Sequence, residues 1–595
     1  MSWDVTCIGE LGESSTPQGD KWCISLGSCD GCAGHHLFAG GFPFREYSRA
    51  DLTNSTTDVP SARSLAYRDW LILLGFCAYL FFYGLGNFGL MGADEPRYAQ
   101  VAREMLARHD WITPTLGGQP WLEKPVLYYW QAMLAFSIFG VKDWVARMPS
   151  AVDATLMVLG VYLFLRRFRP GFQLDGALMT ASMAGMIGFA RASSTDMPLS
   201  ATITLALLGW YAWYESAKRK YLALFYLCIA LGTLAKGPVA IFIAGVVVAL
   251  FAAAKRDFKP IWRTLWSPGI AIFLVIALPW YIAVQSRNPE FFRIFFLEHN
   301  LARFGTNLYH HKEPFWYYLP VTLAGLLPWT VFVLAAIVEV VRAWWAEKRS
   351  MLAGEDAFNA FLLIWLLAPV IFFSISQSKL PGYILPGLPA GTLLLAEYVR
   401  RKVNGEERPP LILSVLHCLL AAMLLAPALL LQYLVLRYQF LSGTAAIISG
   451  VLALAIAIGM IITLRSGYGF RALRFVTLVP VVLAVAAVLR IGAPALDAKL
   501  SARPLAEELS SVDRQNLPIA VFKVSREAEF GLAFYRNQVI SRYEWGQIPA
   551  GEHLVIGIAG SQPQIAKHVP GRRVSYLGSF KPQGLEYFWV AGESQ

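Results

Sequence analysis

The chain has 595 residues, of which 56% are apolar and 15% are charged, and its mean hydropathy is +0.47. Because an ordinary soluble domain carries about 25% charged residues, this composition excludes a soluble globular enzyme and a disordered scaffold. Apolar runs long enough to cross the bilayer recur along the chain, whereas a β-barrel would show alternating strands of about ten residues. The sequence predicts a polytopic α-helical membrane protein.

The formal net charge is +11, from 51 Lys and Arg against 40 Asp and Glu. On a soluble protein such a charge would suggest a nucleic-acid partner. In a membrane protein, basic loop residues orient the helices. We therefore attribute most of the excess to topology and expect the lipid bilayer, and no nucleic acid, as a partner.

Residues 1–65 differ from the rest because they hold four of the seven cysteines, Cys7, Cys23, Cys29 and Cys32, followed by His35 and His36. The mixture resembles a zinc knot, but it lacks a second CxxC or an HxxxH. No cleavable signal pattern precedes Arg68. We interpret this segment as an unstructured extension or a misassigned start.

Thirteen apolar runs are expected to span the membrane: 69–88, 148–165, 173–190, 197–215, 221–235, 238–254, 268–286, 316–341, 358–376, 381–399, 410–436, 443–464 and 473–492. Every second connection is rich in Lys and Arg, as in 166–169, 218–220, 255–263, 342–349, 400–408 and 465–474. Such loops are typically cytoplasmic. This pattern predicts an inside N-terminus and an outside segment after Arg490.

The segment 496–595 is expected to be a small α/β domain on the outer, periplasmic side. Helical patterns cover 504–512, 526–536 and 562–568, and β-like runs cover 519–524, 553–558 and 574–580. It has no nucleotide-binding glycine motif. We interpret it as a lid or docking domain.

The long outer loop 89–147 begins with Asp94-Glu95-Pro96-Arg97, in which Pro96 favours a first helical turn. Apolar residues Tyr98, Val101, Ala102 and Met105 recur at helical spacing, while Arg97, Gln100, Glu104 and Arg108 are expected to face away. This pattern predicts an amphipathic helix on the outer membrane surface. Asp94 is either a helix cap or a functional carboxylate at the interface.

Three further stretches carry groups that a connector does not need. Glu123 and Lys124 precede an aromatic run, where a snorkelling lysine is the alternative. The outer loop 287–315 holds His299, His310 and His311, which either share a divalent metal or form ordinary interfacial hydrogen bonds. Lysines also lie at outer span edges, against the orientation rule, and predict an anionic ligand there: Lys236 and Lys379.

Asp196, which precedes Pro198 at the start of a span, either orients the site or caps the helix.

Together these stretches resemble the GT-C, protein-mannosyltransferase-like glycosyltransferases, and among them the bacterial lipid A aminoarabinose transferases. The resemblance covers Asp94-Glu95-x-Arg97, Glu123-Lys124-Pro125, Leu234–Pro238, Glu298-His299-Asn300 and Lys379-x-Pro381-Gly382-Tyr383. It implies an undecaprenyl-phosphate-linked sugar donor, a lipid A acceptor, and a catalytic domain over 66–495 in the bacterial inner membrane, with its active site facing the periplasm. We expect a monomer.

The resemblance also implies roles for single residues. Asp94 would be the catalytic carboxylate, and the position of Asp196 at an outer span edge makes it a second candidate. Glu123, His299 and His310 would be ligands of a divalent metal such as zinc. Lipid phosphate contacts would come from Lys124, Arg303 and Tyr383, and we add Arg97 and Lys379 as further substrate-binding candidates from their positions in the outer segments.

A single catalytic carboxylate favours direct, inverting displacement. A protein O-mannosyltransferase remains the alternative enzyme, and a lipid transporter or flippase the alternative from another class, although no inverted repeat is visible.

Overall fold

The computed structural model describes residues 62–302, 313–346, 355–424, 443–513, 515–545 and 548–593. Of the expected extension 1–65, residues 1–61 lie outside the described part. The first helix begins at Ala62, inside that expected extension. Residues 425–442, at the end of the expected span 410–436, also lie outside the described part.

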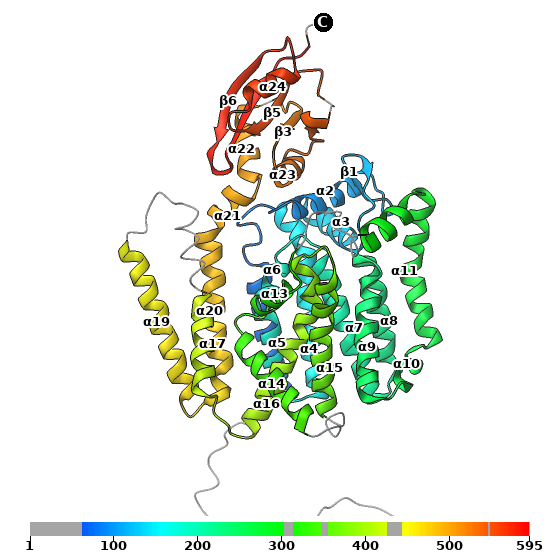
Figure 1. The fold of residues 1–595 in the computed structure, drawn as a ribbon, viewed down its shortest axis with the longest axis vertical. Helices are drawn as coiled ribbons and strands as arrows, with labels where there is room; N and C mark the ends of the chain where they lie inside the picture. The colour runs from blue at the N-terminus through cyan, green and yellow to red at the C-terminus, as the bar shows by residue number, and fades with distance from the viewer. Residues whose placement is uncertain are drawn as a thin grey trace, which may run out of the picture. The chain divides into compact units, whose positions relative to one another are not determined.

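The first half of the helical region runs from α1, through the long loop that contains α2 and α3, to α11 (Figure 1). Its helices are α1 (Ala62–Cys77), the π-helical η1 (Ala78–Phe82), α2 (Asp94–Ala107), α3 (Leu127–Phe139), α4 (Asp143–Phe168), α5 (Gln173–Ser182), α6 (Ala184–Ala190), α7 (Asp196–Ser216), α8 (Arg219–Lys236), α9 (Val239–Lys255), α10 (Lys259–Thr264) and α11 (Ser267–Arg287).

The second half runs from the loop after α11 to the C-terminal domain. Its helices are the π-helical η2 (Arg293–Ala302), α13 (Tyr318–Gly325), α14 (Thr330–Ala346), α15 (Glu355–Ile375), the 3-10 helix η4 (Pro381–Gly387), α16 (Leu388–Asn404), α17 (Leu411–Met423), α19 (Gly443–Arg465), η5 (Gly469–Ala472), α20 (Leu473–Ala487) and η6 (Val488–Gly492).

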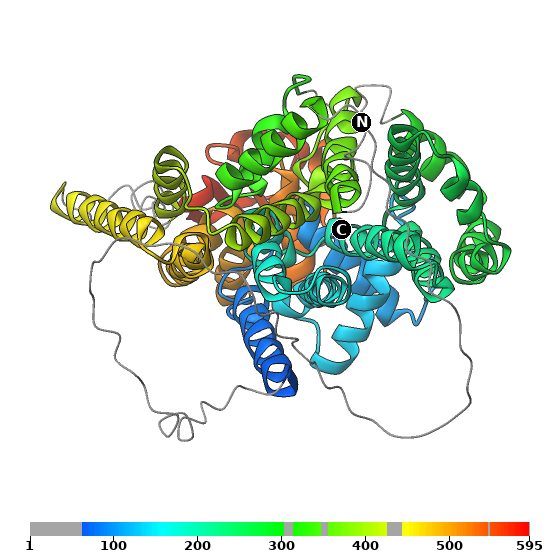
Figure 2. The ribbon, with the colours of Figure 1, turned by 90° about the horizontal axis from the view of Figure 1, so that it is seen from below.

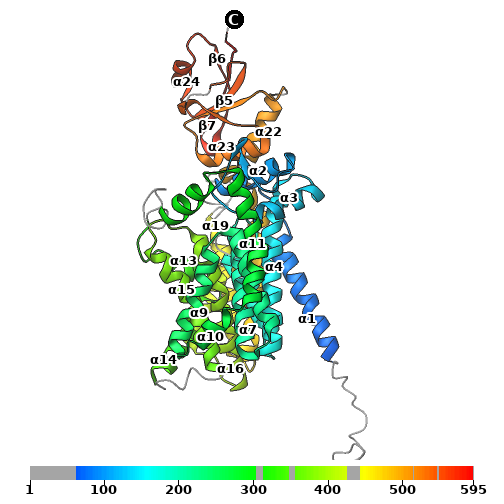
Figure 3. The same ribbon diagram turned by 90° about the vertical axis from the view of Figure 1, so that its right-hand side faces the viewer.

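The bundle has two chemically different ends. We call the end with α2 the α2 end, and the end with α10 the α10 end (Figures 1 and 3). Helices α4, α7, α9, α14, α16 and α19 all end at the α10 end, and the Lys- and Arg-rich connections of the sequence follow these helices. The charge alternation in the sequence therefore corresponds to a spatial separation of the two ends.

Only some of the helices are long enough to span a membrane. Among the described residues, four are long and apolar enough to cross a bilayer, or five if α13 and α14 are counted as one. The count of thirteen spans therefore stays a prediction. The expected span 316–341 is broken, because α13 and α14 are bent by 113°. Pro328 explains the break, since proline lacks the N–H that a continuing helix needs.

Two other expected spans are also interrupted near the α2 end. The run 173–190 is split at Met183, whose backbone is extended, and the run 381–399 begins with the 3-10 turn η4. The short elements α6, α13 and η4 contact one another. Irregular backbone at membrane depth is tolerated where it is buried in protein or lines a cavity, so these breaks point to that end as the functional one.

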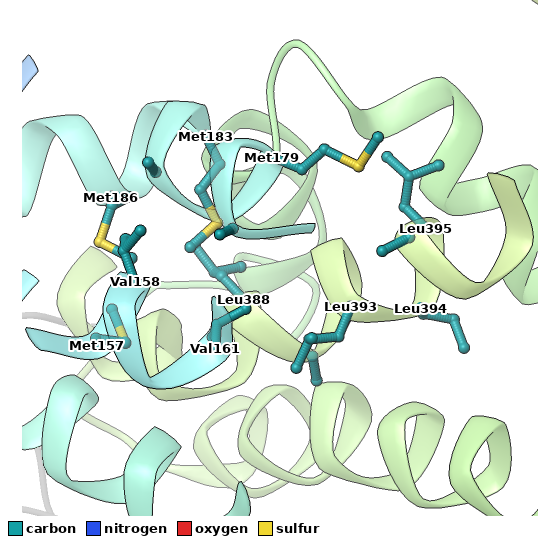
Figure 4. Packing of buried hydrophobic residues seen from close by; sticks show 14 of the residues in the cluster. Met157, Val158, Val161, Met179, Met183, Met186, Leu388, Leu393, Leu394 and Leu395 are labelled. Atoms are coloured by element: carbon teal, nitrogen blue, oxygen red, sulfur yellow. The ribbon is translucent and has the colours of Figure 1, made fainter. Parts of the chain in front are cut away.

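The larger apolar cluster of the bundle includes α4, α5, α6 and α16, and a second cluster joins α2, α3, α8 and α11. Figure 4 shows Met183 and Leu388 near Val158 and Val161, and the Met179 side chain directed toward Leu395. Large apolar side chains are also exposed on the outside, among them Val275, Ile371 and Ile462. Figure 2, seen from the α10 end, shows the helices that carry them around the rim. A bundle that is apolar inside and outside is suited to lipid.

The C-terminal region is an α/β domain, as predicted. Its elements are α21 (Ala493–Leu500), α22 (Arg503–Val512), β3 (Ile519–Phe522), α23 (Arg526–Arg536), β4 (Ser541–Arg542), η7 (Tyr543–Trp545), β5 (His553–Ile558), α24 (Gln562–His568), β6 (Val574–Phe580), η8 (Lys581–Gln583) and β7 (Leu585–Val590). The sheet order is β4-β3-β5-β7-β6, parallel from β4 to β5 and antiparallel beyond. The sequence predicted three of these strands and missed β4 and β7.

This domain packs on α2 through α23. The guanidinium of Arg103 donates to the carbonyl of Phe534 at 2.6 Å, and the backbone N–H of Leu90 donates to the hydroxyl of Tyr535 at 2.7 Å. Helix α2 forms as expected, but Arg97 and Gln100 are buried rather than facing away. The prediction failed because the polar face of α2 is covered by another domain, not by water.

Candidate functional site

A cavity of about 530 Å³ opens at the α2 end of the bundle. Its polar lining comes from four segments that are far apart in the sequence: Glu123, Lys124, Lys236, His299, Ser376, Ser378 and Tyr383. The remaining wall is apolar and mostly aromatic: Leu199, Pro238, Val239, Phe242, Phe295, Phe296, Leu297, Phe372 and Phe373. Five of the residues singled out from the sequence therefore meet in one cavity: Glu123, Lys124, Lys236, His299 and Tyr383.

The loop between α2 and α3 supplies Glu123 and Lys124. It begins with a two-residue hairpin, β1 (Thr115–Leu116) and β2 (Gln119–Pro120), whose turn glycines both have positive φ. The carboxylate of Glu104 accepts hydrogen bonds from the backbone N–H groups of Gly117 at 2.8 Å and Gly118 at 3.1 Å. Helix α2 thereby fixes the hairpin that leads to the two lining residues.

Glu123 faces His299 of η2 across the cavity, with 3.7 Å between Oε1 and Nε2. This separation is too long for a direct hydrogen bond. Two ligands of one zinc ion, each about 2.0–2.2 Å from the metal, are separated by a comparable distance. Within the described ranges no group of three His, Cys, Asp or Glu side chains forms a metal site. His310 lies outside the described residues.

Asp94 and Glu95, adjacent in sequence, have opposite environments. The Asp94 side chain is 57% exposed and forms an ion pair with Arg97. The carboxylate of Glu95 is buried and accepts hydrogen bonds from Arg147 Nη2 at 2.6 Å and from the backbone N–H of Ser193 at 2.9 Å. Glu95 therefore anchors the start of α2, and only Asp94 is available to a ligand.

Arg97 connects Asp94 with the cavity. Its guanidinium lies 5.1 Å from the ring centroid of Trp121 and 5.6 Å from that of Phe530 in α23. Burial by itself lowers the pKa of Arg97, but the neighbouring Asp94 and Glu123 carboxylates, with Tyr98, raise it above its ordinary value. Arg97 therefore stays protonated between an exposed carboxylate and one that lines the cavity.

The buried phenol of Tyr98 is close enough to the same carboxylates for their charges to affect its pKa. Its pKa is raised above the ordinary value, first by burial and then by the nearby carboxylates of Asp94, Asp196 and Glu123. Three carboxylates of the candidate site thus act electrostatically on one buried hydroxyl, which remains protonated and neutral. The site is more compact than the positions of its residues in the sequence suggest.

Asp196 forms an ion pair with Lys236 at the ends of α7 and α8. Its carboxylate also accepts a hydrogen bond from the Ser194 hydroxyl at 3.1 Å. These contacts rule against the alternative that Asp196 serves only as a helix cap. Gly382 is needed beside it, because a Cβ there would come within 2.6–2.9 Å of the carboxyl group. The 3-10 turn η4 can therefore bring Tyr383 to the cavity.

Lys236, which the sequence indicated as an outer-edge cation for an anionic ligand, lines the cavity. It pairs with Asp196, and its ammonium lies 4.8 Å from the ring centroid of Tyr383. Gly237 follows with a φ of +89°, and a Cβ there would lie 2.5 Å from the Phe295 ring. The sequence Lys-Gly-Pro at the end of a span could have identified this site. Only glycine, which lacks a Cβ, allows η2 to approach the backbone so closely.

Lys379 lies beside the cavity but does not line it. Its ammonium donates to the carbonyl of Ser376 at 2.5 Å, and burial lowers its pKa below the ordinary value. It fixes the backbone of a segment whose serines do line the cavity. Arg303, the other predicted phosphate ligand, lies outside the described residues.

The chemistry of the cavity suits an amphiphile with an anionic head. Lys124 and Lys236 supply positive charge, and the aromatic wall supplies an apolar surface. A second cavity of about 570 Å³, lined almost entirely by apolar residues of α8, α9, α11 and η2, shares Pro238 and Phe296 with the first. A polar head and an apolar chain can therefore be bound side by side.

Comparisons with known proteins support this interpretation. Residues 123–282 match the sequence model of the dolichyl-phosphate-mannose-protein mannosyltransferase family. An undecaprenyl phosphate-alpha-4-amino-4-deoxy-L-arabinose arabinosyl transferase of Pseudomonas aeruginosa is 33% identical over 344 residues, 56% of this chain and 60% of the relative. A relative of the same name from Serratia proteamaculans is 31% identical over 61% of this chain and 66% of its own length.

The chain thus matches somewhat less than two thirds of the length of these relatives. For the fold, the crystal structure of ArnT from Cupriavidus metallidurans bound to undecaprenyl phosphate superposes with a TM-score of 0.68. It is 21% identical and covers 89% of this chain and all of its own. The chain therefore has an ArnT-like fold, and the predicted resemblance to the GT-C glycosyltransferases is confirmed in both sequence and fold.

Proposed function

We propose that the protein transfers 4-amino-4-deoxy-L-arabinose from undecaprenyl phosphate to a phosphate group of lipid A. The observation that carries the proposal is the cavity itself, in which two lysines and the Glu123 carboxylate lie beside an aromatic wall that continues into an apolar groove. The names of the sequence relatives supply the sugar and the lipid carrier. A polyprenyl phosphate has the matching chemistry, with an anionic head and an apolar chain.

We place the α2 end at the periplasmic face of the bacterial inner membrane. The helices that precede the basic connections end at the α10 end, and loops rich in Lys and Arg are typically cytoplasmic. The candidate site would then meet the outer leaflet of that membrane, where lipid A is available as acceptor.

The proposed reaction is a direct displacement with inversion. A lipid A phosphate oxygen attacks C1 of the sugar, and the bond from C1 to the oxygen of undecaprenyl phosphate breaks with its electron pair leaving on that phosphate. A phosphate monoester already carries about 1.5 negative charges near neutral pH. Asp94 accepts the remaining proton or orients the nucleophile, and the Lys124 and Lys236 ammonium groups stabilise the charge on the leaving phosphate.

A divalent metal is part of this proposal. Glu123 and His299 are spaced like two ligands of one ion, although the described residues supply no third ligand. A bound metal would add positive charge near the lipid phosphate. Elemental analysis of chelator-free protein should find a stoichiometric metal in the wild type and in His109→Asn, an exposed histidine elsewhere, but not in His299→Gln. Equal metal content in all three, or none in the wild type, would contradict the assignment.

The function is tested by mass spectrometry of lipid A from cells with and without the protein, and the expected result is a gain of the aminopentose mass. In purified protein, Asp94→Asn should lower turnover at least about 100-fold, because a positioned proton acceptor contributes about that much. Glu290→Gln is the matched control, since Glu290 is similarly exposed and also pairs with an arginine three residues later.

If Asp94→Asn and Glu290→Gln are equally active, Asp94 is not the catalytic carboxylate. Transfer of a hexose to peptide instead of lipid A would support the alternative of a protein O-mannosyltransferase, which the matched family model favours.

A further inference from the structure

A second polar cavity lies at the opposite end of the protein, at the α10 end. It has a volume of about 380 Å³ and is formed where α7 and α9 end and where α8, α10 and α11 meet (Figure 1). Binding sites for small molecules typically measure about 300–1,000 Å³. The helices that separate it from the candidate site run the length of the bundle, so the two cavities are distinct.

The lining combines cations with aromatic rings. Arg219, Lys259 and Arg263 contribute three positive charges, and Asp257 contributes one negative charge. The carboxylate of Asp257 accepts a hydrogen bond from the backbone N–H of Lys259 at 3.0 Å. Within the ranges that the structure describes, none of the three cations has an ion-pair partner. The cavity therefore carries a net positive charge that its own acidic residue does not neutralise.

The frame of the cavity is fixed by hydrogen bonds. Thr264, at the end of α10, accepts from the indole N–H of Trp210 in α7 at 2.8 Å and donates to the carbonyl of Pro260 at 2.8 Å. The hydroxyl of Tyr226 in α8 donates to the carbonyl of Thr264. Helix α10 is thus attached to both neighbouring helices, and its cations are held over a preformed space.

Apolar side chains next to these cations point to membrane contact. Phe258, Trp262 and Leu265 are 54%, 72% and 58% exposed, and each is adjacent in sequence or within two residues of Lys259 or Arg263. Tryptophans and basic residues together are typical of the level of the lipid headgroups. Basic pockets between helices at this level are suited to the headgroups of anionic lipids.

We propose that this cavity binds the phosphate of an anionic phospholipid in the leaflet at the α10 end. The phosphate is held by Arg219, Lys259 and Arg263, while the acyl chains leave along Trp262 and Leu265. The site is independent of the proposed sugar transfer, because it shares no lining residue with the candidate site.

The test is native mass spectrometry of purified full-length protein titrated with phosphatidylglycerol, with phosphatidylcholine as the zwitterionic comparison. The site variant is Arg219→Gln/Lys259→Gln/Arg263→Gln. The control variant removes three cations from the same end but outside the cavity: Arg167→Gln/Arg408→Gln/Arg471→Gln. Each cation near an anionic lipid changes binding about fivefold, so the site variant should bind phosphatidylglycerol about 100-fold more weakly than the control variant.

A variant that strengthens binding separates the proposal from misfolding. Asp257→Asn removes the repelling charge and keeps an oxygen for the Lys259 N–H, so it should bind phosphatidylglycerol about fivefold more tightly. Equal binding by the site and control variants would overturn the proposal, as would unchanged binding in Asp257→Asn. Displacement of the lipid by millimolar inorganic phosphate would also overturn it and assign the cavity to a soluble anion.

Discussion

Replacement of Glu95 by glutamine tests whether, in the acidic pair at the start of α2, Glu95 has a structural role and Asp94 a chemical one. Glu95 accepts from Arg147 through two bonds, of 2.6 and 3.3 Å, and also from the backbone N–H of Met91 at 2.8 Å. The Arg147 side chain is fully buried and itself donates to the carbonyls of Leu85 and Phe88 at 2.8 Å. Glu95→Gln leaves this guanidinium without its counter-charge.

Breaking a buried ion pair by removing one partner costs about 3–5 kcal/mol. Since 1.4 kcal/mol is a factor of about ten, the α2 end should open about 10²–10⁴ times more often. Asp94→Asn is the neighbouring comparison, because the Asp94 side chain is 57% exposed and an exposed ion pair is worth about 0–1 kcal/mol. Hydrogen exchange of peptides covering 88–107 and 189–200 in full-length protein measures both effects.

We expect Glu95→Gln to lose protection in both peptides, and Asp94→Asn to keep it while losing turnover. Equal protection in the two variants would refute the reasoning, since it would mean that the buried pair contributes nothing to the α2 end. Faster exchange in the 88–107 peptide alone would also contradict it, because the carboxylate holds the N–H of Ser193 as well.

Three further predictions concern the cavity and the C-terminal domain. Lys236→Met should lower the thermal stability of the purified protein and weaken donor use about tenfold or more, because it leaves Asp196 without its cation; unchanged melting and an unchanged KM for the donor would contradict this. Lys124→Gln should weaken donor use more than Tyr383→Phe, since the lysine supplies a charge and the tyrosine a hydroxyl; equal losses in donor titrations would count against a phosphate at this place. The imidazole of His553 is buried, which lowers its pKa below 6.5, so the unfolded chain binds the proton more readily and the stability of the domain should be full above pH of about 6.5 and fall below it. Hydrogen exchange of β5 and β7 at pH 7.5 and 5.5 should show this loss in the wild type and not in His553→Gln.

Local patterns were enough to predict much of the fold. Composition gave the membrane class, and helical spacing located α2 from its first residue, because periodicity and Pro96 are properties of neighbouring residues. The same holds for the C-terminal helices α22, α23 and α24. Strand β7 was missed although its residues are apolar and aromatic, since its place is set by pairing with β5 and β6 rather than by its own sequence.

The candidate site depended on contacts that no local pattern contains. The sequence singled out Glu123, Lys124, His299 and Tyr383 as unusual residues for loops, and the structure brings them to one cavity. It could not separate Asp94 from Glu95, because only the position of Arg147, about fifty residues later, decides which carboxylate is buried. It also misjudged the polar face of α2, since a domain from the far end of the chain covers it. Residue chemistry is determined by the sequence itself, whereas burial and charge pairing are properties of the neighbours that the tertiary structure supplies.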